Sequence, residues 1–225
     1  MGVPLKNIVR NCRELEKSDQ LKEFEKRNGT TFSKMVKNAR IFSNLMVFSL
    51  KDMQDWNLLK NSKFKTTTSK FNLSECISEV YEMMLMKANL KSLRLESTTN
   101  AKIPREVIGD KVRFQQVILN MVQNAISFTS EGKVQMYTFY NFLTQQVEFK
   151  VTDTGIGIKP EEQNQVFKIV KSDEKIGIGL TISKQIAAKY NGNIKFESEY
   201  KKGSTFEMNF DMEEYEPREN RDDFE

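Results

Sequence analysis

The sequence predicts an α+β protein: a two-layer α/β sandwich, with helices on one face of a mixed sheet, preceded by a helical hairpin. Two observations favour this class. Apolar residues recur every three to four positions in the first 60 residues, as in amphipathic helices. From residue 66 onward, helical patterns alternate with runs of period two, in the order strand, helix, strand, helix, two strands, helix, two strands.

The hairpin is expected in the first 56 residues. Residues 4–26 have apolar side chains at rough helical spacing, and "KRNGTT" at 26–31 indicates a turn. A second helix is predicted from Phe32 to Trp56. Its apolar stripe consists of Phe32, Met35, Ala39, Phe42, Met46, Met53 and Trp56. Two helices alone bury little of such a stripe, so we expect a homodimer through residues 1–60, closed as a four-helix bundle.

The elements of the sandwich follow in order. "FNLSECISEVYEMMLMKANLK" predicts a helix that Asn72 caps, with Glu75 three residues on. "SLRLEST" is a candidate strand, which ends before Pro104, and the next helix opens at Asp110. "GKVQMYTFY" and "QQVEFKVTD" predict a β-hairpin. Residues 179–190 predict a helix, and residues 192–210 a final hairpin.

Composition excludes several functional classes. The net charge of +4 divides into −6 in the tail, residues 211–225, and +10 in the remainder, but the lysines are dispersed and no nucleic-acid motif interleaves them. No apolar run could span a bilayer and the first residues lack a signal core, so a cytoplasmic protein is expected, attached to a membrane only through segments outside this chain. With no histidine and two separated cysteines, a transition-metal site is not expected. The predicted domains are 1–62, 63–212 and an acidic disordered tail, 213–225.

Polar side chains at two places suggest a ligand site. Asn120 and Asn124 are four residues apart on the helix from Asp110, so they share one edge of it. An Asn carbonyl is a good neutral ligand for Mg²⁺, which usually arrives with substrate phosphates. Asp153 follows an alternating strand, where its carboxylate could accept a hydrogen bond from an exocyclic amine such as that of adenine.

Two glycine pairs follow these residues. Gly155 and Gly157 allow a sharp turn close to a flat ligand. Gly177 and Gly179 are predicted to open a helix, whose first amides can bind phosphate. Each motif alone is common, and a lone "GIG" is usually just a turn. Their order along one chain is what indicates a nucleotide site.

These motifs carry a family resemblance. From about Asp110 to Phe210 the chain resembles the ATP-binding catalytic domain of hybrid-type sensor histidine kinases, which has the Bergerat (GHKL) fold of gyrase B, Hsp90 and MutL. "DKVRFQQVILNMVQNAISFTSEGKV" is similar to that family's asparagine box. "VTDTGIGI" and "GIGLTISKQIAAKYNGNIKFESEYKKGSTFEMNF" are similar to its two glycine boxes and closing hairpin.

The resemblance implies Mg²⁺-ATP as cofactor and phosphoryl transfer to a histidine in a two-component phosphorelay. Asn124 would ligate Mg²⁺, Asn120 would lie near the phosphates, and both would be catalytic. Asp153 would recognise the adenine amine. The remaining cofactor-binding residues would be Gly155 and Gly157 on the nucleotide, Gly177, Gly179 and Leu180 at the phosphates, and Thr205 at the adenine through water.

Several features bear on the activity that the resemblance implies. ATP-hydrolysing relatives carry a Glu at the position of Asn120, which cannot take a proton, so transfer is favoured over hydrolysis. Ser127 and Lys175 stand where the family has Lys and Gly, and the lid segment, 167–177, is short. These changes favour the alternative of a catalytically impaired pseudokinase that acts as a dimerising interaction module. "GVPL" at 2–5 resembles the end of the acceptor box, so the acceptor histidine is expected upstream of Met1 or in a partner in trans.

Overall fold

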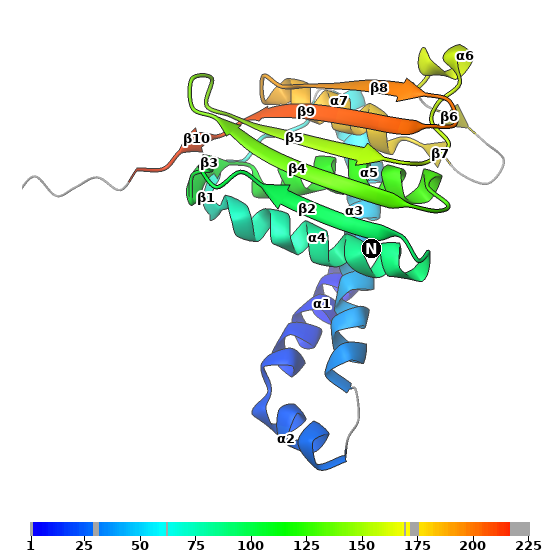
Figure 1. Ribbon diagram of the computed structural model, residues 1–225. Coiled ribbons are helices and arrows are strands. Elements are labelled where there is room, and N and C mark those ends of the chain that lie inside the picture. The colour runs from blue at the N-terminus through cyan, green and yellow to red at the C-terminus, as the bar shows by residue number, and fades with distance from the viewer. Residues whose placement is uncertain (1, 29–31, 62, 169, 172–175, 217–225) are drawn as a thin grey trace, which may run out of the picture. The chain divides into compact units, whose positions relative to one another are not determined.

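The computed structural model describes residues 2–28, 32–61, 63–168, 170–171 and 176–216 (Figure 1). The chain divides into two compact units, Met1–Phe64 and Lys65–Glu225. This division lies two residues from the predicted boundary between residues 62 and 63.

The first unit consists of three helices: α1 (Gly2–Lys17), α2 (Asp19–Asn28) and α3 (Phe32–Lys60). α1 packs along α3, as expected for a hairpin. The first arm is interrupted at Ser18, whose Oγ accepts a hydrogen bond from the Leu21 backbone at 3.4 Å and so caps α2. Arg40 Nε and Glu16 Oε1, 2.9 Å apart, connect the two arms.

Much of the apolar stripe on α3 is exposed in the single chain. Its exposed members are Phe32, Met35, Ala39, Phe42, Met46 and Met53. Contiguous apolar surface of this kind marks an interaction site when it lies along one helix.

The second unit is an α/β sandwich. Its main sheet has the order β2 (Arg94–Thr99), β4 (Lys133–Asn141), β5 (Gln146–Asp153), β9 (Gly203–Asp211) and β8 (Asn193–Glu199). β2 pairs with β4 in parallel and the other neighbours are antiparallel, so the sheet is mixed as predicted. Helices α4 (Leu73–Leu90), α5 (Lys111–Phe128) and α7 (Gly179–Lys189) lie together on one face of it (Figure 1).

The core lies between this face and the helices. Phe114 of α5 contacts Phe210 of β9 edge-to-face, with ring centroids 5.7 Å apart, and Tyr190 stacks on Phe210 at 4.4 Å. Burying each large side chain contributes about 1.5–3 kcal/mol. The apolar side of α5 is buried from Phe114 to Ala125, whereas Phe128, the last residue of the helix, is 58% exposed.

Several short elements escaped the sequence analysis. β3 (Glu106–Gly109) and β10 (Glu213–Glu214) were not expected; they form a second sheet with β1 (Ser69–Asn72), the strand expected before α4, in the order β1-β3-β10. α6 (Pro160–Gln163) and the pair β6 (Val170–Lys171) and β7 (Ile176–Gly177) lie between β5 and α7. Elements of two to four residues show no usable periodicity. The predicted disordered tail therefore begins with a strand at its first two residues, and residues 217–225 lie outside the described part.

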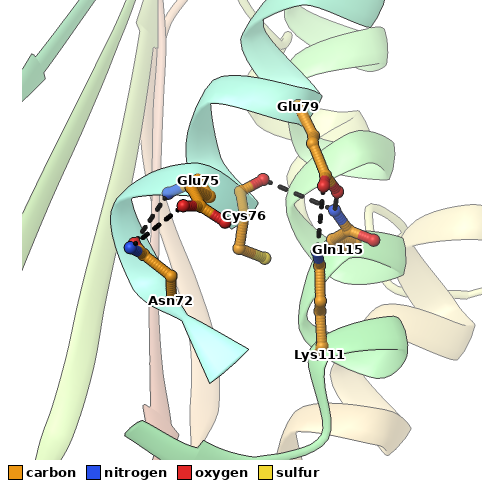
Figure 2. A network of polar contacts seen from close by, with 6 residues as sticks. All are labelled: Asn72, Glu75, Cys76, Glu79, Lys111 and Gln115. Atoms are coloured by element: carbon orange, nitrogen blue, oxygen red, sulfur yellow. Dashed lines mark hydrogen bonds and ion pairs between the residues drawn. The ribbon is translucent and has the colours of Figure 1, made fainter. Parts of the chain in front are cut away.

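Side-chain contacts fix α4 and attach it to α5. Asn72 Oδ1 accepts the Glu75 backbone N–H at 3.0 Å, and Asn72 Nδ2 donates to Glu75 Oε1 at 3.3 Å, so the predicted cap is confirmed. One turn further along, Glu79 accepts from Gln115 Nε2 at 2.6 Å and pairs with Lys111 Nζ at 3.0 Å (Figure 2). These contacts hold the helix that carries both candidate asparagines.

Asp110 anchors the start of α5. Its Oδ1 accepts the Arg113 N–H at 3.1 Å, which is the predicted N-cap. Its Oδ2 accepts from the Thr67 backbone, the Thr67 hydroxyl and the Tyr190 hydroxyl, at 3.1, 2.9 and 2.6 Å. Burial acts to raise the pKa of Asp110, but the hydrogen bonds from Tyr190, Arg113 and Thr67 outweigh it and hold the pKa below its usual value. One carboxylate thus connects the segment before β1 to α5 and to the end of α7.

Candidate functional site

Asp153 ends β5 with its side chain on the helix-covered side of the sheet. It is 6% exposed, and its Oδ1 accepts backbone hydrogen bonds from Gly155 at 2.9 Å and Ser204 at 3.3 Å. Oδ2 accepts no hydrogen bond from any described residue. Burial raises the pKa of Asp153 more than these two hydrogen bonds lower it. The result is a fixed, largely desolvated carboxylate with one acceptor available to a ligand donor.

The neighbour of Asp153 on β9 is Ser204, and this corrects the assignment of Thr205. Asp153 pairs with Ser204 in the register of β5 and β9, whereas Thr205 pairs with Thr152. The Thr205 and Thr152 hydroxyls lie 3.1 Å apart. Successive side chains of a strand point to opposite faces, so Thr205 lies on the face away from Asp153. The hydroxyl on the face of Asp153 is therefore that of Ser204.

The glycines after Asp153 are required by packing of the chain itself, and their contact with a nucleotide stays a prediction. A Cβ at Gly155 would lie 2.5 Å from the Phe128 carbonyl oxygen and 2.8 Å from Asp153 Oδ1. Gly157 has φ +62°, and a Cβ there would overlap the Glu199 carbonyl. Both positions exclude a side chain because backbone occupies the space. The glycines thus press the loop onto α5 and the β8–β9 turn, and so fix Asp153.

The two asparagines of α5 have different environments. Asn120 Nδ2 donates to Ser183 Oγ at 3.1 Å and to the Gly179 carbonyl at 3.4 Å, so it connects α5 to the first turns of α7. A Cβ at Gly179 would lie 3.3 Å from the Asn120 carboxamide. Asn124 is half-buried and makes no side-chain hydrogen bond to a described residue. The bonds of Asn120 use its Nδ2, whereas the whole carboxamide of Asn124, including its oxygen, is available to a ligand such as a metal ion.

The start of α7 offers backbone donors. The helix begins at Gly179, and its N-cap residue, Ile178, provides no side-chain hydrogen bond. Leu180 lies in the first turn, where amide N–H groups have no partner within the helix. Gly177 lies before the helix, in β7, and does not open it as predicted. An uncapped helix start with its dipole is suited to an anion such as phosphate.

Ser127 and the lid segment are two of the departures from the family pattern. Ser127 is exposed and donates to the Gln123 carbonyl at 2.6 Å, so it contributes no charge where the family pattern has Lys. Lys175 and much of the predicted lid lie outside the described residues. At the beginning of that segment Phe167 contacts Phe196, with ring centroids 5.7 Å apart, and the Lys184 ammonium lies 4.2 Å from the Phe167 ring.

The donor set fits a metal that comes with its substrate. Across the parts of the chain that the structure describes, no three His, Cys, Asp or Glu side chains gather to hold a metal ion. Asn124 could supply one oxygen, and Mg²⁺ would take its other ligands from phosphates and water.

The described helices include none that is long and apolar enough to cross a membrane.

Sequence reasoning missed Ser183 and Ser204. The period-two pattern of β9 could have identified Ser204, because it shares a face with the apolar Phe206, Met208 and Phe210. No sequence signal connects Ser183 to Asn120, since the two are joined only by the packing of α7 on α5.

Comparison with known proteins agrees with this geometry. Residues 109–214 match the family described as "Histidine kinase-, DNA gyrase B-, and HSP90-like ATPase". This domain belongs to that family. Among characterised relatives it resembles the histidine kinases, so it is an ATP-binding module of the histidine-kinase type.

Two Escherichia coli kinases illustrate the similarity. The chain is 30% identical over 182 residues to the signal transduction histidine-protein kinase BarA, covering 76% of this chain and 20% of BarA. It is 27% identical over 217 residues to the aerobic respiration control sensor protein ArcB, covering 92% of this chain and 27% of ArcB. The chain thus spans about a fifth to a quarter of the length of these relatives.

Solved structures support the fold. Full-length ShkA in complex with AMPPNP matches with a TM-score of 0.67 and 21% identity, over 94% of this chain and 44% of that one. The catalytic domain of the histidine kinase ThkA matches with a TM-score of 0.57 and 27% identity, over 64% of this chain and 95% of that one. The histidine-kinase-like domain therefore has the predicted Bergerat architecture.

Proposed function

We propose that this chain binds Mg²⁺-ATP between α5, the Asp153–Gly157 loop and the start of α7, and transfers the γ-phosphoryl group to a histidine. The observation that carries the proposal is Asp153: a buried carboxylate with one oxygen fixed by two backbone amides and the other available. Such an acceptor matches the exocyclic amine of adenine. The sequence contains no histidine, so the acceptor belongs to another chain or to a segment beyond this one.

The residues of this site act by binding and orientation. Asp153 would select adenine, with the Ser204 hydroxyl beside it. The first amides of α7, at Gly179 and Leu180, would receive phosphate oxygens. Asn124 would hold Mg²⁺, which when bound neutralises charge on the phosphates. Asn120 is neutral and bonded to Ser183, so it provides no base to activate water, and the attacking group would be the acceptor imidazole.

The exposed apolar side chains of α3 favour a second copy of this chain as the partner of the helical unit. The exposed stripe of α3 is apolar along most of its length, and two such hairpins can bury their stripes as a four-helix bundle. The hairpin contains no histidine, so a histidine-bearing helix would come from a partner or from a segment beyond this chain. Sedimentation of residues 1–64 at several concentrations tests the dimer directly.

Titration calorimetry tests nucleotide binding. The intact chain is titrated with ATP with and without Mg²⁺, next to Asp153→Ala and Asn124→Ala. We expect binding that Asp153→Ala abolishes and that Asn124→Ala weakens only in the presence of Mg²⁺. A folded chain that binds no ATP at millimolar concentration would refute the proposal and leave the interaction-module alternative.

Transfer needs its own assay. The chain is incubated with γ-labelled ATP and a supplied protein that carries a histidine-bearing dimerisation helix, with the same protein lacking that histidine as control. An acid-labile label on the supplied histidine is expected. An acid-stable label, or binding without transfer to any histidine helix, contradicts the kinase assignment.

A further inference from the structure

Lys91 lies in the turn that follows α4 and reaches across to α5. Its backbone is fixed as the C-cap of α4, where its N–H donates to the carbonyls of Ala88 and Asn89. Its ammonium donates three hydrogen bonds, to the carbonyls of Ile126, Ser127 and Thr129, at 2.8, 2.8 and 3.1 Å. All three donors of the lysine are therefore used on the last turn of one neighbouring helix.

The end of α5 depends on partners from elsewhere in the fold. The last four carbonyls of a helix have no partner within it, and α5 has no basic residue of its own in its last turn. Thr129 Oγ1 donates to the Ala125 carbonyl at 2.7 Å, and the Ile156 N–H donates to the Phe128 carbonyl at 3.2 Å. The carbonyls of Ile126 and Ser127 remain, and Lys91 binds both. A cation at this end of the helix also complements the helix dipole.

The same turn of α5 is the surface on which the Asp153 loop lies. The Ile156 N–H bonds to the Phe128 carbonyl, and Gly155 fits against that carbonyl so closely that a Cβ would be 2.5 Å away. The Gly155 N–H in turn donates to Asp153 Oδ1. A shift of the end of α5 would therefore move the Gly155 amide and, through it, the carboxylate.

We propose that Lys91 is a positioning residue of the nucleotide site: its ammonium holds the C-terminal turn of α5 where the Asp153–Gly157 loop is aligned for adenine. The proposal rests on the proposed ATP site and concerns a residue whose ammonium is used on backbone carbonyls at the end of α5. Because Lys91 acts on the adenine side, its loss should weaken the binding of adenosine, ADP and ATP alike. The loss of a lysine that neutralised phosphates would weaken the binding of ATP most and leave the binding of adenosine unchanged.

The test compares Lys91→Met, which keeps the aliphatic stem, with Lys91→Arg, which keeps the charge and several donors. Lys102→Met is the matched control, because Lys102 is exposed and its ammonium makes no hydrogen bond or ion pair with a described residue. Affinities for adenosine and ATP are measured by calorimetry well below the unfolding temperature of each variant. Hydrogen exchange of the Ile156 amide is followed in the nucleotide-free protein.

Lys91→Met is expected to lower both affinities about tenfold and to speed exchange at Ile156, with most of both effects reversed in Lys91→Arg. Unchanged exchange and affinity would overturn the proposal, and so would a loss confined to ATP. If the wild-type chain binds no adenine compound, the proposed function fails. The Ile156 amide then still decides whether Lys91 holds the loop, with unchanged exchange counting against it.

Discussion

Asp153→Asn separates ligand recognition from folding in one substitution. The asparagine Oδ1 can still accept both backbone hydrogen bonds, from Gly155 at 2.9 Å and Ser204 at 3.3 Å. The other side-chain atom changes from an acceptor oxygen to an NH₂ donor, which would face the adenine amine. Losing a hydrogen bond to a charged group costs about 1.5–3 kcal/mol, so we expect the ATP dissociation constant to rise about 10- to 150-fold.

Asp153→Asn should weaken ATP binding, but it should stabilise the nucleotide-free protein at neutral pH. The pKa of Asp153 is raised by burial, so the ionised carboxylate destabilises the folded state at neutral pH. An acid whose pKa is raised on folding binds more protons in the native state, and wild-type stability therefore increases as pH falls through the folded pKa. Asp153→Asn should unfold at the same or a higher temperature than wild type at pH 7, and its advantage should disappear at low pH.

The assay pairs calorimetry with thermal unfolding at pH 7 and at about pH 4, close to the usual pKa of Asp. Asp153→Ala is the matched control: it removes Oδ1 as well, leaves two buried N–H groups without a partner, and should lower the unfolding temperature. The reasoning is refuted if Asp153→Asn binds ATP within about threefold of wild type, or if it unfolds at a much lower temperature at pH 7.

Three further predictions follow from single contacts. Asn124→Ala should leave the unfolding temperature unchanged. It should lower the affinity for Mg²⁺-ATP about tenfold and leave the affinity for adenosine unchanged. An equal loss of affinity for adenosine would contradict a metal-binding role. Tyr190→Phe removes the 2.6 Å hydrogen bond to Asp110 and should lower the free energy of unfolding by about 1–3 kcal/mol at pH 7. Because the pKa of Asp110 is lowered, denaturant titrations should show less of this loss near pH 3, and an equal loss at both pH values would exclude the charged hydrogen bond. Gly157→Ala should cost about 2 kcal/mol or more, through the positive φ and the Glu199 carbonyl, and an unchanged unfolding temperature would show that the loop is not held there.

Local patterns predicted the parts of the fold that local physics determines. Asn72 and Asp110 were recognised as helix caps because the cap and the amide that it binds are three residues apart. The alternation of β4 and β5 identified a hairpin for a similar reason, since a short turn joins its two strands. The strands β3 and β10 were missed because their pairing joins residues that are about 100 positions apart and each contributes too few side chains to show a period.

Within the site, residue types were predictable and their partners were not. Asp153, Asn124 and the glycines stand out by spacing. Thr205 was named only because of the family resemblance, and the sheet register places Ser204 beside Asp153 instead. Nothing near Lys91 in sequence indicates that its ammonium closes a helix that ends 37 residues later. Such contacts arise when separate elements pack, and no short pattern encodes them.

By itself, the sequence determined that this chain is an α+β sandwich with a helical hairpin, and that it carries an amide pair, an acid and glycines in the order of a histidine-kinase nucleotide site. It could do so because caps, periodicity and turns act over a few residues. The tertiary structure alone decided which acceptor atom of Asp153 is available, that Asn120 is committed to α7 while Asn124 is not, and that the glycines serve chain packing. These depend on which backbone lies against which side chain, and that is set only when distant segments bury their apolar faces together.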